Sequence, residues 1–286
     1  MTETYELEAL ANYHCRCGEN PLWDERRKLV YWTDIPAGRL FRYDVRSGRH
    51  EPFYAGGVVG GFTLQEDGSL LLFGENQIRL LDPDGGREQA VADDIDDDMT
   101  RFNDVIADPA GRVFAGTMGR TRTSGGLYRV EADGRATCLF KGTGISNGMA
   151  FTPDRKGFYW TDSSARKIFR FDYDQANGEL SNRRVFLDLS AEGSTPDGMT
   201  VDAGGSIWSA RWDGWAVFRY SPEGSLIEKI QFPVAKVSSV IFGGDGLDEL
   251  YVTTAGGSEG ADTADGTLYR LKVSAKGLPE FRSRIG

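Results

Sequence analysis

The feature that most constrains the fold is a pattern repeated six times along the 286 residues of the chain. Each copy has an acidic or glycine-containing turn, then a short strand rich in aromatic and β-branched residues, and then a strand of alternating polarity. Steps of about 41, 42, 45, 49 and 43 residues separate the matching positions, Tyr31, Leu72, Phe114, Tyr159, Trp208 and Tyr251. A period of about 40 to 50 residues with short strands is typical of β-propellers. The pattern predicts an all-β fold, a six-bladed β-propeller, with residues 1–286 as a single domain.

The composition agrees with this fold and argues against several partners. The chain has 37 glycines and 12% aromatic residues, which suit tight turns and pleated surfaces. Its net charge of −10 disfavours nucleic acid and anionic membranes as partners, because both attract basic surfaces. Three cysteines make no disulfide framework, and the first residues lack a signal-peptide pattern, so we expect a cytoplasmic protein, a monomer or weak homodimer. We also expect residues 5–9 and 281–285 to share one blade and to close the ring.

The residues just before each acidic turn are candidates for the innermost strand of each blade, beside the central channel. Matching positions in the six copies are Glu19, Gly61, Asn103, Asn147, Asp197 and Ser239. Four of the six carry a carboxylate or amide oxygen. Such a ring suits Ca²⁺, Mg²⁺ or Mn²⁺, and less selectively Zn²⁺ or Fe²⁺. The repeat therefore predicts a site for one divalent metal ion at one end of the channel.

Other kinds of site find less support in the residues. The two histidines, His14 and His50, fall outside the channel positions, which argues against a Ser-His-Asp triad. Cys15 and Cys17 have no second cysteine pair to complete a thiolate metal site.

Several motifs together resemble the SMP-30/gluconolactonase/LRE family, which includes regucalcin and bacterial sugar lactonases. The resemblance covers nearly the whole chain. The matching motifs include Cys15–Trp23, Arg101–Asp104, Asp108–Met118, Ile145–Gly148, Pro196–Met199 and Tyr251–Thr254. The resemblance implies a six-bladed propeller that hydrolyses a sugar lactone to the aldonic acid with one divalent metal ion.

The resemblance also implies roles for particular residues. Glu19, Asn147 and Asp197 are the implied metal ligands, and Asp197 is in addition the implied general base. Asn103 is expected beside the metal, contacting substrate or bound water, and Arg101 is expected to contact the sugar. The implied chemistry is polarisation of the lactone carbonyl and activation of water.

Two other functions fit the same residues and stay open at this point. One is a phosphotriesterase of the diisopropylfluorophosphatase type, because a polarised P=O bond resembles a polarised C=O bond. The other is a non-enzymatic calcium-binding protein of the regucalcin type.

Three segments bear on the identity of the substrate without determining it. In regucalcin-like members, acidic residues after the Ala-Gly-Thr-Met motif help to hold the substrate, whereas this chain has Gly119-Arg-Thr-Arg122. An acidic or differently shaped lactone is therefore one expectation. The acidic run Asp93–Asp98 is expected to be a solvated loop, a lid or a second cation site. Trp212 and Trp215 are expected either to wall the channel mouth or to pack within a blade.

Overall fold

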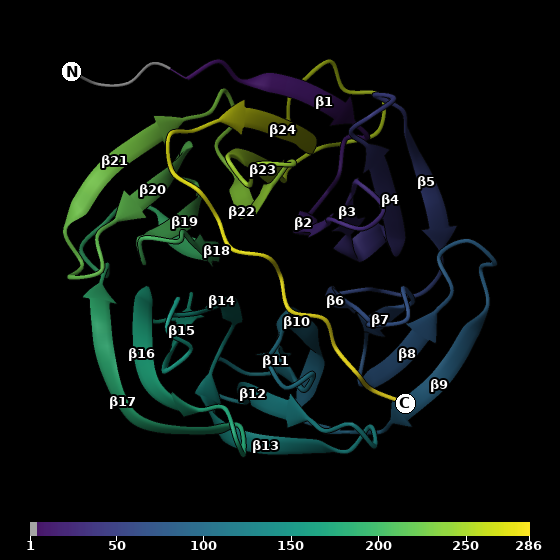
Figure 1. Ribbon diagram of the computed structural model, residues 1–286, viewed down its shortest axis with the longest axis vertical. Helices are drawn as coiled ribbons and strands as arrows, with labels where there is room; N and C mark the ends of the chain where they lie inside the picture. The colour runs from purple at the N-terminus through teal and green to yellow at the C-terminus, as the bar shows by residue number, and fades with distance from the viewer. Residues whose placement is uncertain (1–4) are drawn as a thin grey trace.

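The computed structural model describes residues 5–286 and shows six blades arranged as a ring around a central channel (Figure 1). Within these residues the chain forms six four-stranded antiparallel sheets, which confirms the predicted six-bladed β-propeller. Blades 1 to 3 contain β2 (Gly18–Asp24), β3 (Leu29–Asp34), β4 (Arg39–Asp44), β5 (His50–Ala55); β6 (Gly61–Leu64), β7 (Leu70–Phe73), β8 (Gln77–Leu81), β9 (Glu88–Asp93); and β10 (Met99–Ala107), β11 (Val113–Gly119), β12 (Gly125–Val130), β13 (Ala136–Thr143).

Blades 4 to 6 have the same order of strands, with the innermost strand first. They contain β14 (Ser146–Phe151), β15 (Gly157–Asp162), β16 (Lys167–Asp174), β17 (Glu179–Asp188); β18 (Thr195–Val201), β19 (Ile207–Trp212), β20 (Ala216–Tyr220), β21 (Leu226–Gln231); and β22 (Val237–Gly243), β23 (Glu249–Thr254), β24 (Thr267–Lys272), β1 (Glu8–Asn12). A single turn of 3₁₀ helix, η1 (Ile35–Ala37), follows β3. In the part of the chain described, no helix is long and apolar enough to cross a membrane.

The ring closes because the N-terminal strand completes the last blade. β1 pairs antiparallel with β24, and the innermost strands β2 and β22 contact each other across the junction. Ser238 Oγ donates a hydrogen bond to the carbonyl oxygen of Gly18 at this junction (2.5 Å). The expectation that residues 281–285 share this blade is wrong. After β24 the yellow trace in Figure 1 crosses the ring, and Ser283 and Ile285 bond to Leu64 and Gln65 of blade 2.

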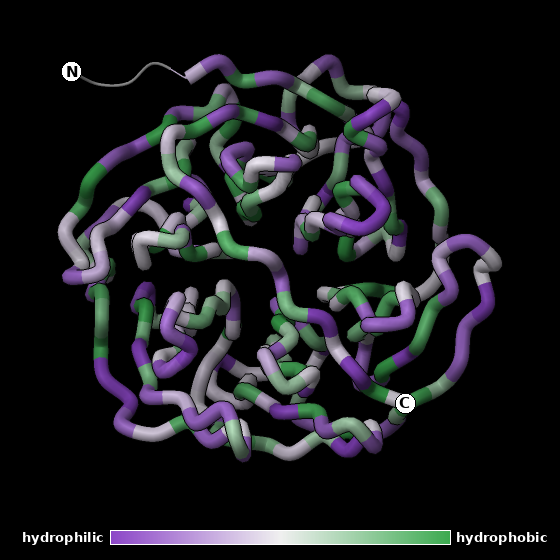
Figure 2. The backbone as a smooth tube through the Cα atoms, in the orientation of Figure 1, coloured by the Kyte–Doolittle hydropathy of each residue, from purple (hydrophilic) through white to green (hydrophobic). Residues whose placement is uncertain are grey.

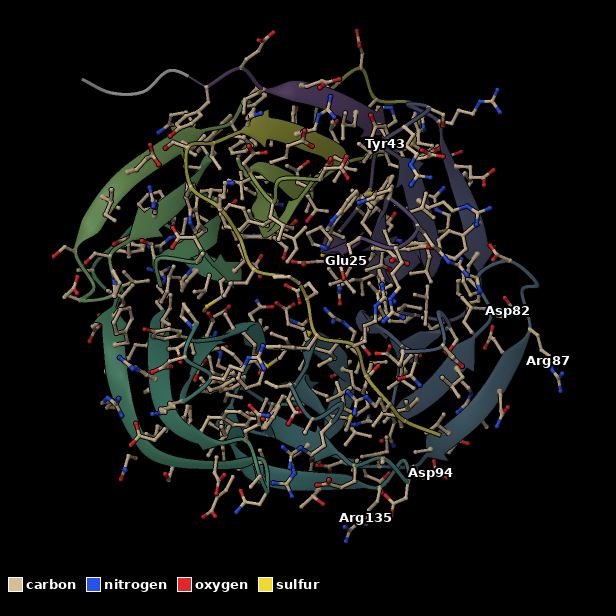
Figure 3. The ribbon with its side chains drawn as sticks, viewed as in Figure 1. Glu25, Tyr43, Asp82, Arg87, Asp94 and Arg135 are labelled. Atoms are coloured by element: carbon tan, nitrogen blue, oxygen red, sulfur yellow. The ribbon has the colours of Figure 1, made fainter. Side chains whose placement is uncertain are left out.

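The hydrophobic core lies between the blades. Six clusters of buried side chains each join two neighbouring blades, and the aromatic positions of the repeat are among them. Tyr31, Tyr159 and Trp208 are each 1% exposed. Burying one large apolar side chain contributes about 1.5–3 kcal/mol, so each repeat stabilises its contact with the next one. Hydrophilic residues recur along the outermost strands (Figure 2), and the side chains of Arg87 and Arg135, just before β9 and β13, project outward (Figure 3).

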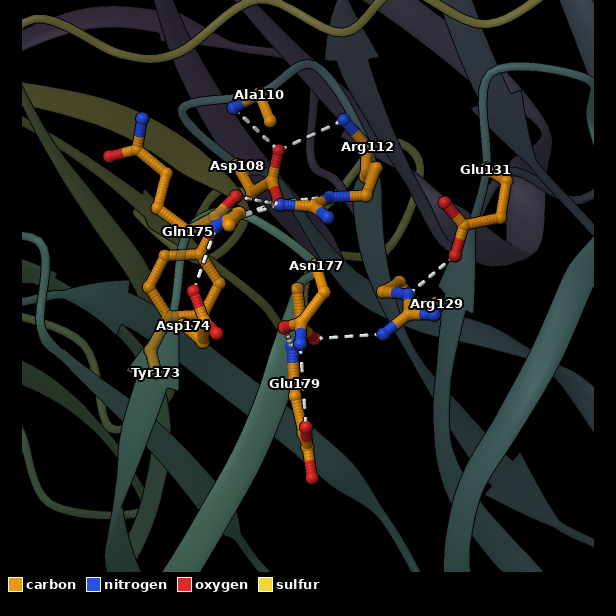
Figure 4. A network of polar contacts seen from close by, with 12 residues as sticks. Asp108, Ala110, Arg112, Arg129, Glu131, Tyr173, Asp174, Gln175, Asn177 and Glu179 are labelled. Carbon is orange, nitrogen blue, oxygen red and sulfur yellow. Dashed lines mark hydrogen bonds and ion pairs between the residues drawn. The ribbon is translucent and has the colours of Figure 1, made fainter.

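The acidic turns of the repeat hold neighbouring blades together. Asp108 is fully buried at the end of β10, and its carboxylate accepts hydrogen bonds from Ala110 N, Arg112 N, Arg112 Nε and Tyr173 Oη, at 2.7–3.0 Å (Figure 4). Arg112 Nη2 also donates to Gln175 O in blade 4 (2.6 Å). Buried charges are stable in proteins when paired in this way. Asp108 therefore joins blades 3 and 4 as well as making a turn.

The C-terminal residues 277–286 form a strap across this acidic-turn end of the channel. Gly277 forms a bridge with Asp202, and Ser283 N donates to Leu64 O (2.9 Å). Gln65 Nε2 donates to Ile285 O (2.6 Å). The strap therefore links blades that are far apart in the sequence.

A cavity of about 310 Å³ lies in the channel, between the strap and the starts of the innermost strands. Leu278, Glu280 and Phe281 of the strap line one end of it, and Asn20 and Asp104 line the other. The Glu280 carboxyl is half-buried, and burial raises its pKa to about 7. The strap therefore places one ionisable group in a mainly apolar channel.

We predict that the strap depends on Arg282, whose Nη2 lies 2.6 Å from Asp24 Oδ1 with both side chains nearly buried. Replacing Arg282 by Met leaves the Asp24 carboxylate without its counter-charge, so the free energy of unfolding should fall by about 3 kcal/mol. Urea unfolding measures this change. Arg284→Met, in the same strap but exposed, is the control, and equal destabilisation by both variants would contradict the prediction.

We also predict that Glu280 makes stability depend on pH. Because its pKa in the folded protein is above the ordinary value of 4.5, folding favours the protonated form. The associated stability is fully present below about pH 4.5 and is lost as the pH rises through 7. Glu280→Gln should therefore gain about 1 kcal/mol at pH 8, after allowing for partial hydration, and less at pH 5. Unfolding curves at both pH values test this, with exposed Glu223→Gln as the control.

Candidate functional site

The oxygen-bearing channel residues lie together at the end of the channel opposite the strap. They lie within the first five residues of the innermost strands β2, β10, β14, β18 and β22. Each is about 5% exposed: Glu19, Asn103, Asn147, Asp197 and Ser239. The sixth position, Gly61, is buried in β6 but offers no side-chain ligand.

A β-bulge directs these side chains toward the channel. The pairing of the innermost strand with the next strand shifts by a residue or more in five of the six blades, and the shift falls at or beside the channel position. In β18, for example, the register shifts between Pro196 and Met199, on either side of Asp197. β6 pairs with β7 without a shift, and it is the strand that carries Gly61. Bulges are common beside active sites because they change the direction of a side chain.

Glycines after the channel residues let neighbouring innermost strands approach closely. A Cβ atom at Gly148 would lie 2.6 Å from the carbonyl oxygen of Asp197, and one at Gly198 would collide with Ser239. Neither glycine has a positive φ angle. The repeated Asn-Gly and Asp-Gly pairs therefore do not form turns. They bring Asn147 and Asp197 toward each other.

A chain of hydrogen bonds fixes the amide side chains across blades 3 and 4. Arg101 Nη1 donates to Asn103 Oδ1, and Asn103 Nδ2 donates to Asn147 Oδ1. Asn103 Nδ2 also donates to Ser146 O (2.9 Å). These bonds place Arg101, Asn103 and Asn147 in one connected group.

The chain continues into blade 5 through a residue that the sequence did not single out. Asn147 Nδ2 donates to Ser163 Oγ (2.8 Å), and Ser163 Oγ donates to Pro196 O (2.6 Å). Pro196 precedes Asp197. Ser163 therefore orients the Asn147 amide so that its oxygen faces away from Ser163.

The buried carboxylates at this mouth, Glu19 and Asp197, lie close to another acidic residue, and Arg101 is the basic residue that acts on both. Burial, followed by the charges of Asp197 and Asp104, raises the pKa of Glu19 well above its ordinary value. Burial and then the charge of Asp104 raise the pKa of Asp197 well above its ordinary value. The Arg101 guanidinium opposes both effects. A group of buried carboxylates that repel one another is stabilised by binding a cation.

The donor set fits a hard divalent ion. Two carboxylates and one or two amide oxygens are the ligands that Ca²⁺ and similar ions prefer. Among residues 5–286, no group of three or more His, Cys, Asp and Glu side chains is placed to hold a metal ion, so the predicted site would need an amide oxygen as well. Glu19, Asn147 and Asp197 would hold the ion. That assignment stays a prediction.

Asp104 is the channel residue that the sequence analysis missed. It follows Asn103 within the bulge of β10, and its Oδ1 atom is buried without a hydrogen-bond partner. Burial raises the pKa of Asp104 to about 7. In a regular strand, neighbouring side chains point to opposite faces, so Asp104 would point away from the channel if Asn103 points into it. The bulge in β10 lets both side chains reach the channel, and the sequence pattern does not reveal this bulge.

Two loops beside this mouth are tied to each other. Lys141 Nζ lies 2.7 Å from Asp96 Oδ2 and 2.9 Å from Asp98 Oδ2. Arg120 Nε donates to Asp97 O (2.7 Å). The acidic run Asp93–Asp98 and the basic segment Gly119–Arg122 therefore form a joined rim, and several of the acids have partners as well as solvent.

Trp212 is the last residue of β19, and Trp215 lies on the turn between β19 and β20. Trp212 pairs with Thr195 at the start of β18, and Lys236 Nζ is 5.1 Å from its ring. Trp215 is 51% exposed. Trp215 is therefore not packed within a blade, and its role as a wall of the mouth stays a prediction.

Comparison with known proteins supports the resemblance seen in the sequence. Residues 17–256 match the model of the SMP-30/Gluconolactonase/LRE-like region. A pentonolactonase of Haloferax volcanii is 46% identical over 95% of this chain and 96% of its own. A 6-deoxy-6-sulfogluconolactonase of Pseudomonas putida is 35% identical, with 98% of each chain covered.

A solved structure agrees with the fold. The crystal structure of a calcium-binding protein, regucalcin, from Agrobacterium tumefaciens superposes with a TM-score of 0.92 at 26% identity, covering 100% of this chain and 99% of the other. The family match spans most of the chain, and the relatives match over nearly their full lengths. This chain belongs to the SMP-30/gluconolactonase/LRE-like family.

Proposed function

We propose that this protein is a divalent-metal-dependent lactonase that hydrolyses a sugar lactone to the aldonic acid. The observation that carries the proposal is the convergence of Glu19, Asn147 and Asp197 at one mouth of the channel, with Arg101 and Asn103 beside them. Its support is the similarity over nearly the whole chain to relatives that are named pentonolactonase and 6-deoxy-6-sulfogluconolactonase.

The proposed metal centre uses hard oxygen donors. Glu19, Asn147 and Asp197 bind one divalent ion, with Ca²⁺, Zn²⁺, Mn²⁺, Mg²⁺ and Fe²⁺ as the candidates. When bound, the ion supplies Lewis-acid polarisation of the lactone carbonyl and a lower pKa for a bound water.

Side chains of the protein carry out the proton transfer and bind the substrate. The oxygen of a water molecule adds to the carbonyl carbon of the lactone while the Asp197 carboxylate takes a proton from that water. The bond between this carbon and the ring oxygen then breaks, and the proton passes to the ring oxygen, which leaves as a hydroxyl group. Arg101 donates hydrogen bonds to sugar hydroxyls or to the carboxylate that forms, and Asn103 orients the substrate.

Hydrogen bonds within the protein already fix the Asn103 amide in one orientation. Its Oδ1 accepts from Arg101, and its Nδ2 donates to Ser146 O (2.9 Å) and to Asn147. A shift of Arg101 toward a bound sugar leaves Asn103 still fixed by two bonds. The amide therefore keeps its position while the guanidinium adapts to the substrate.

We predict that Asp197→Asn and Glu19→Gln weaken metal binding and activity together with the fold intact. Each variant removes a charge from the proposed ligand set, so the dissociation constant for the metal should rise at least about tenfold. Loss of the base should lower kcat of Asp197→Asn by about 10²-fold or more, even at saturating metal. Calorimetric metal titration and acid release from a panel of aldonolactones measure both effects.

Asp213→Asn is the matched control, because Asp213 is an exposed carboxylate on the turn that follows β19 in the same blade. Activity lost on EDTA treatment and restored by one divalent ion is the expected behaviour of the wild-type protein. Full activity of Asp197→Asn would refute its role as base. Calcium binding without turnover of any lactone would instead favour a regucalcin-like binding protein, and faster turnover of a phosphotriester would favour a phosphotriesterase.

We predict a different result for Arg101→Met. This variant removes donors to the sugar but none of the proposed metal ligands, so KM for the lactone should rise about 10-fold or more. The metal dissociation constant should not rise, since the lost charge is positive. Steady-state kinetics at saturating metal separate these effects, with exposed Arg122→Met as the control. An unchanged KM would show that Arg101 does not contact the substrate.

A further inference from the structure

Two carboxyl groups inside the channel have no hydrogen-bond partner in the part of the chain that the structure describes. Asp104 Oδ1 is buried and accepts no hydrogen bond, and Arg101 acts on this carboxyl only through its charge. Glu280, on the strap, forms neither a hydrogen bond nor an ion pair with residues 5–286. Buried polar atoms in native proteins nearly always have partners, and a buried charge without one costs free energy. The two groups therefore point to a ligand that the chain itself does not supply.

Both groups line the channel cavity of about 310 Å³, at opposite ends of it. Glu280 also lines a small side pocket together with Ile106 and Ala107, at the end of β10. Asp104 lies three residues before Ala107 on that strand. A strand rises about 3.3 Å per residue, so the two carboxyl groups lie at levels of the channel that differ by roughly 10 Å.

The wall between the two carboxyl groups is mainly apolar. Five blades and the strap contribute to it, with Leu22, Ile106, Phe151, Val201, Ile241 and Phe281. The third ionisable residue of the lining is Arg155, which is exposed, and its guanidinium lies 5.1 Å from the centre of the Phe281 ring. Leu278 and Pro279 of the strap are exposed as well, so the cavity opens to solvent beside the strap. The interior behind this opening therefore holds two acidic groups and no basic one.

This arrangement selects one chemical class of ligand. A bare metal ion does not match it, because Ca²⁺ takes about 6–8 oxygen ligands and each end of the cavity offers one carboxylate. An alkylammonium group has N–H donors for a carboxylate oxygen at about 2.8 Å, and its methylene groups suit an apolar wall. With one such hydrogen bond at each end, a span of roughly 10 Å leaves room for a short unbranched chain.

We propose that the channel cavity binds a linear aliphatic diamine, with one ammonium group at Glu280, the other at Asp104 and the methylene groups against the apolar wall. None of the proposed metal ligands lines this cavity, so the inference goes beyond the proposed function and does not depend on it. A bound diamine would also fix the strap to β10, because the ligand joins a residue of each.

The experiment is a calorimetric titration of the full-length protein with hexamethylenediamine. It is done at pH 8, above the pKa of about 7 of Glu280, so that this carboxyl is mostly ionised. Hexylamine and hexanediol are the matched probes, because they have the same chain with one ammonium group or with none. The diamine should bind at least about tenfold more tightly than hexylamine, since its second ammonium group gains a second carboxylate. Hexanediol should bind more weakly than either amine.

Three variants locate the bound diamine. Glu280→Gln and Asp104→Asn should each raise its dissociation constant about 10-fold or more, because each removes one charged hydrogen-bond acceptor. In the double variant the preference for the diamine over hexylamine should disappear. Exposed Glu223→Gln is the control and should stay within twofold of wild type.

Asp197→Asn tests whether the diamine binds instead at the acidic mouth. A larger loss of affinity in this variant than in Glu280→Gln would overturn the inference. Equal binding of hexamethylenediamine and hexylamine to the wild-type protein would also overturn it, and so would an unchanged dissociation constant in Glu280→Gln. Because Glu280→Gln is expected to be more stable at pH 8, unfolding would not explain a loss of binding. Lactone turnover is not measured, so each of these results leaves the proposed function standing.

Discussion

The site depends on closure of the ring of blades. Glu19 comes from the first blade and Asp197 from the fifth, and they meet because β2 contacts β22 across the junction between the first and last blades. At the same junction β1 pairs with β24, which puts the N-terminal strand in one sheet with β22, β23 and β24. The mouth of the channel is therefore a property of the closed ring and not of any one blade. A ligand that binds all of these residues would in turn stabilise the closed form.

The two ends of the channel use acidic residues in opposite ways. At the strap end, Asp108 is saturated with hydrogen bonds, and Asp24 pairs with Arg282. At the other end, Glu19 and Asp197 repel each other and Asp104 keeps an unpaired oxygen. The same innermost strands connect the two ends. Bonding at the strap end can therefore offset the unfavourable charge at the mouth, as is common where functional sites reduce stability.

The sequence predicted the elements that follow from periodicity. Six aromatic strands at regular steps implied six blades, and the matching channel positions included Glu19, Asn103, Asn147 and Asp197, because equivalent residues of a propeller lie at the same height in the ring. The sequence did not predict what breaks the periodicity. The bulge in β10 that brings Asp104 to the channel adds residues without any marker in the pattern. The strap has no alternating polarity, and its partners lie in distant loops, so its path followed only from the structure.

The joined rim beside the mouth bears on which lactone the site accepts. Arg120 and Arg122 are both exposed, and Arg120 is turned toward the acidic run through its bond to Asp97 O. The acids of that run are in part neutralised by Lys141. The rim therefore has charges of both signs, and its net effect on a substrate depends on which loop the substrate touches. Under the proposed function, a lactone bound to Arg101 and Asn103 would have its distal groups close to this rim, because both residues lie on β10, shortly after the acidic run. The proposed function therefore assigns substrate preference to the rim and the reaction to the buried ring beneath it.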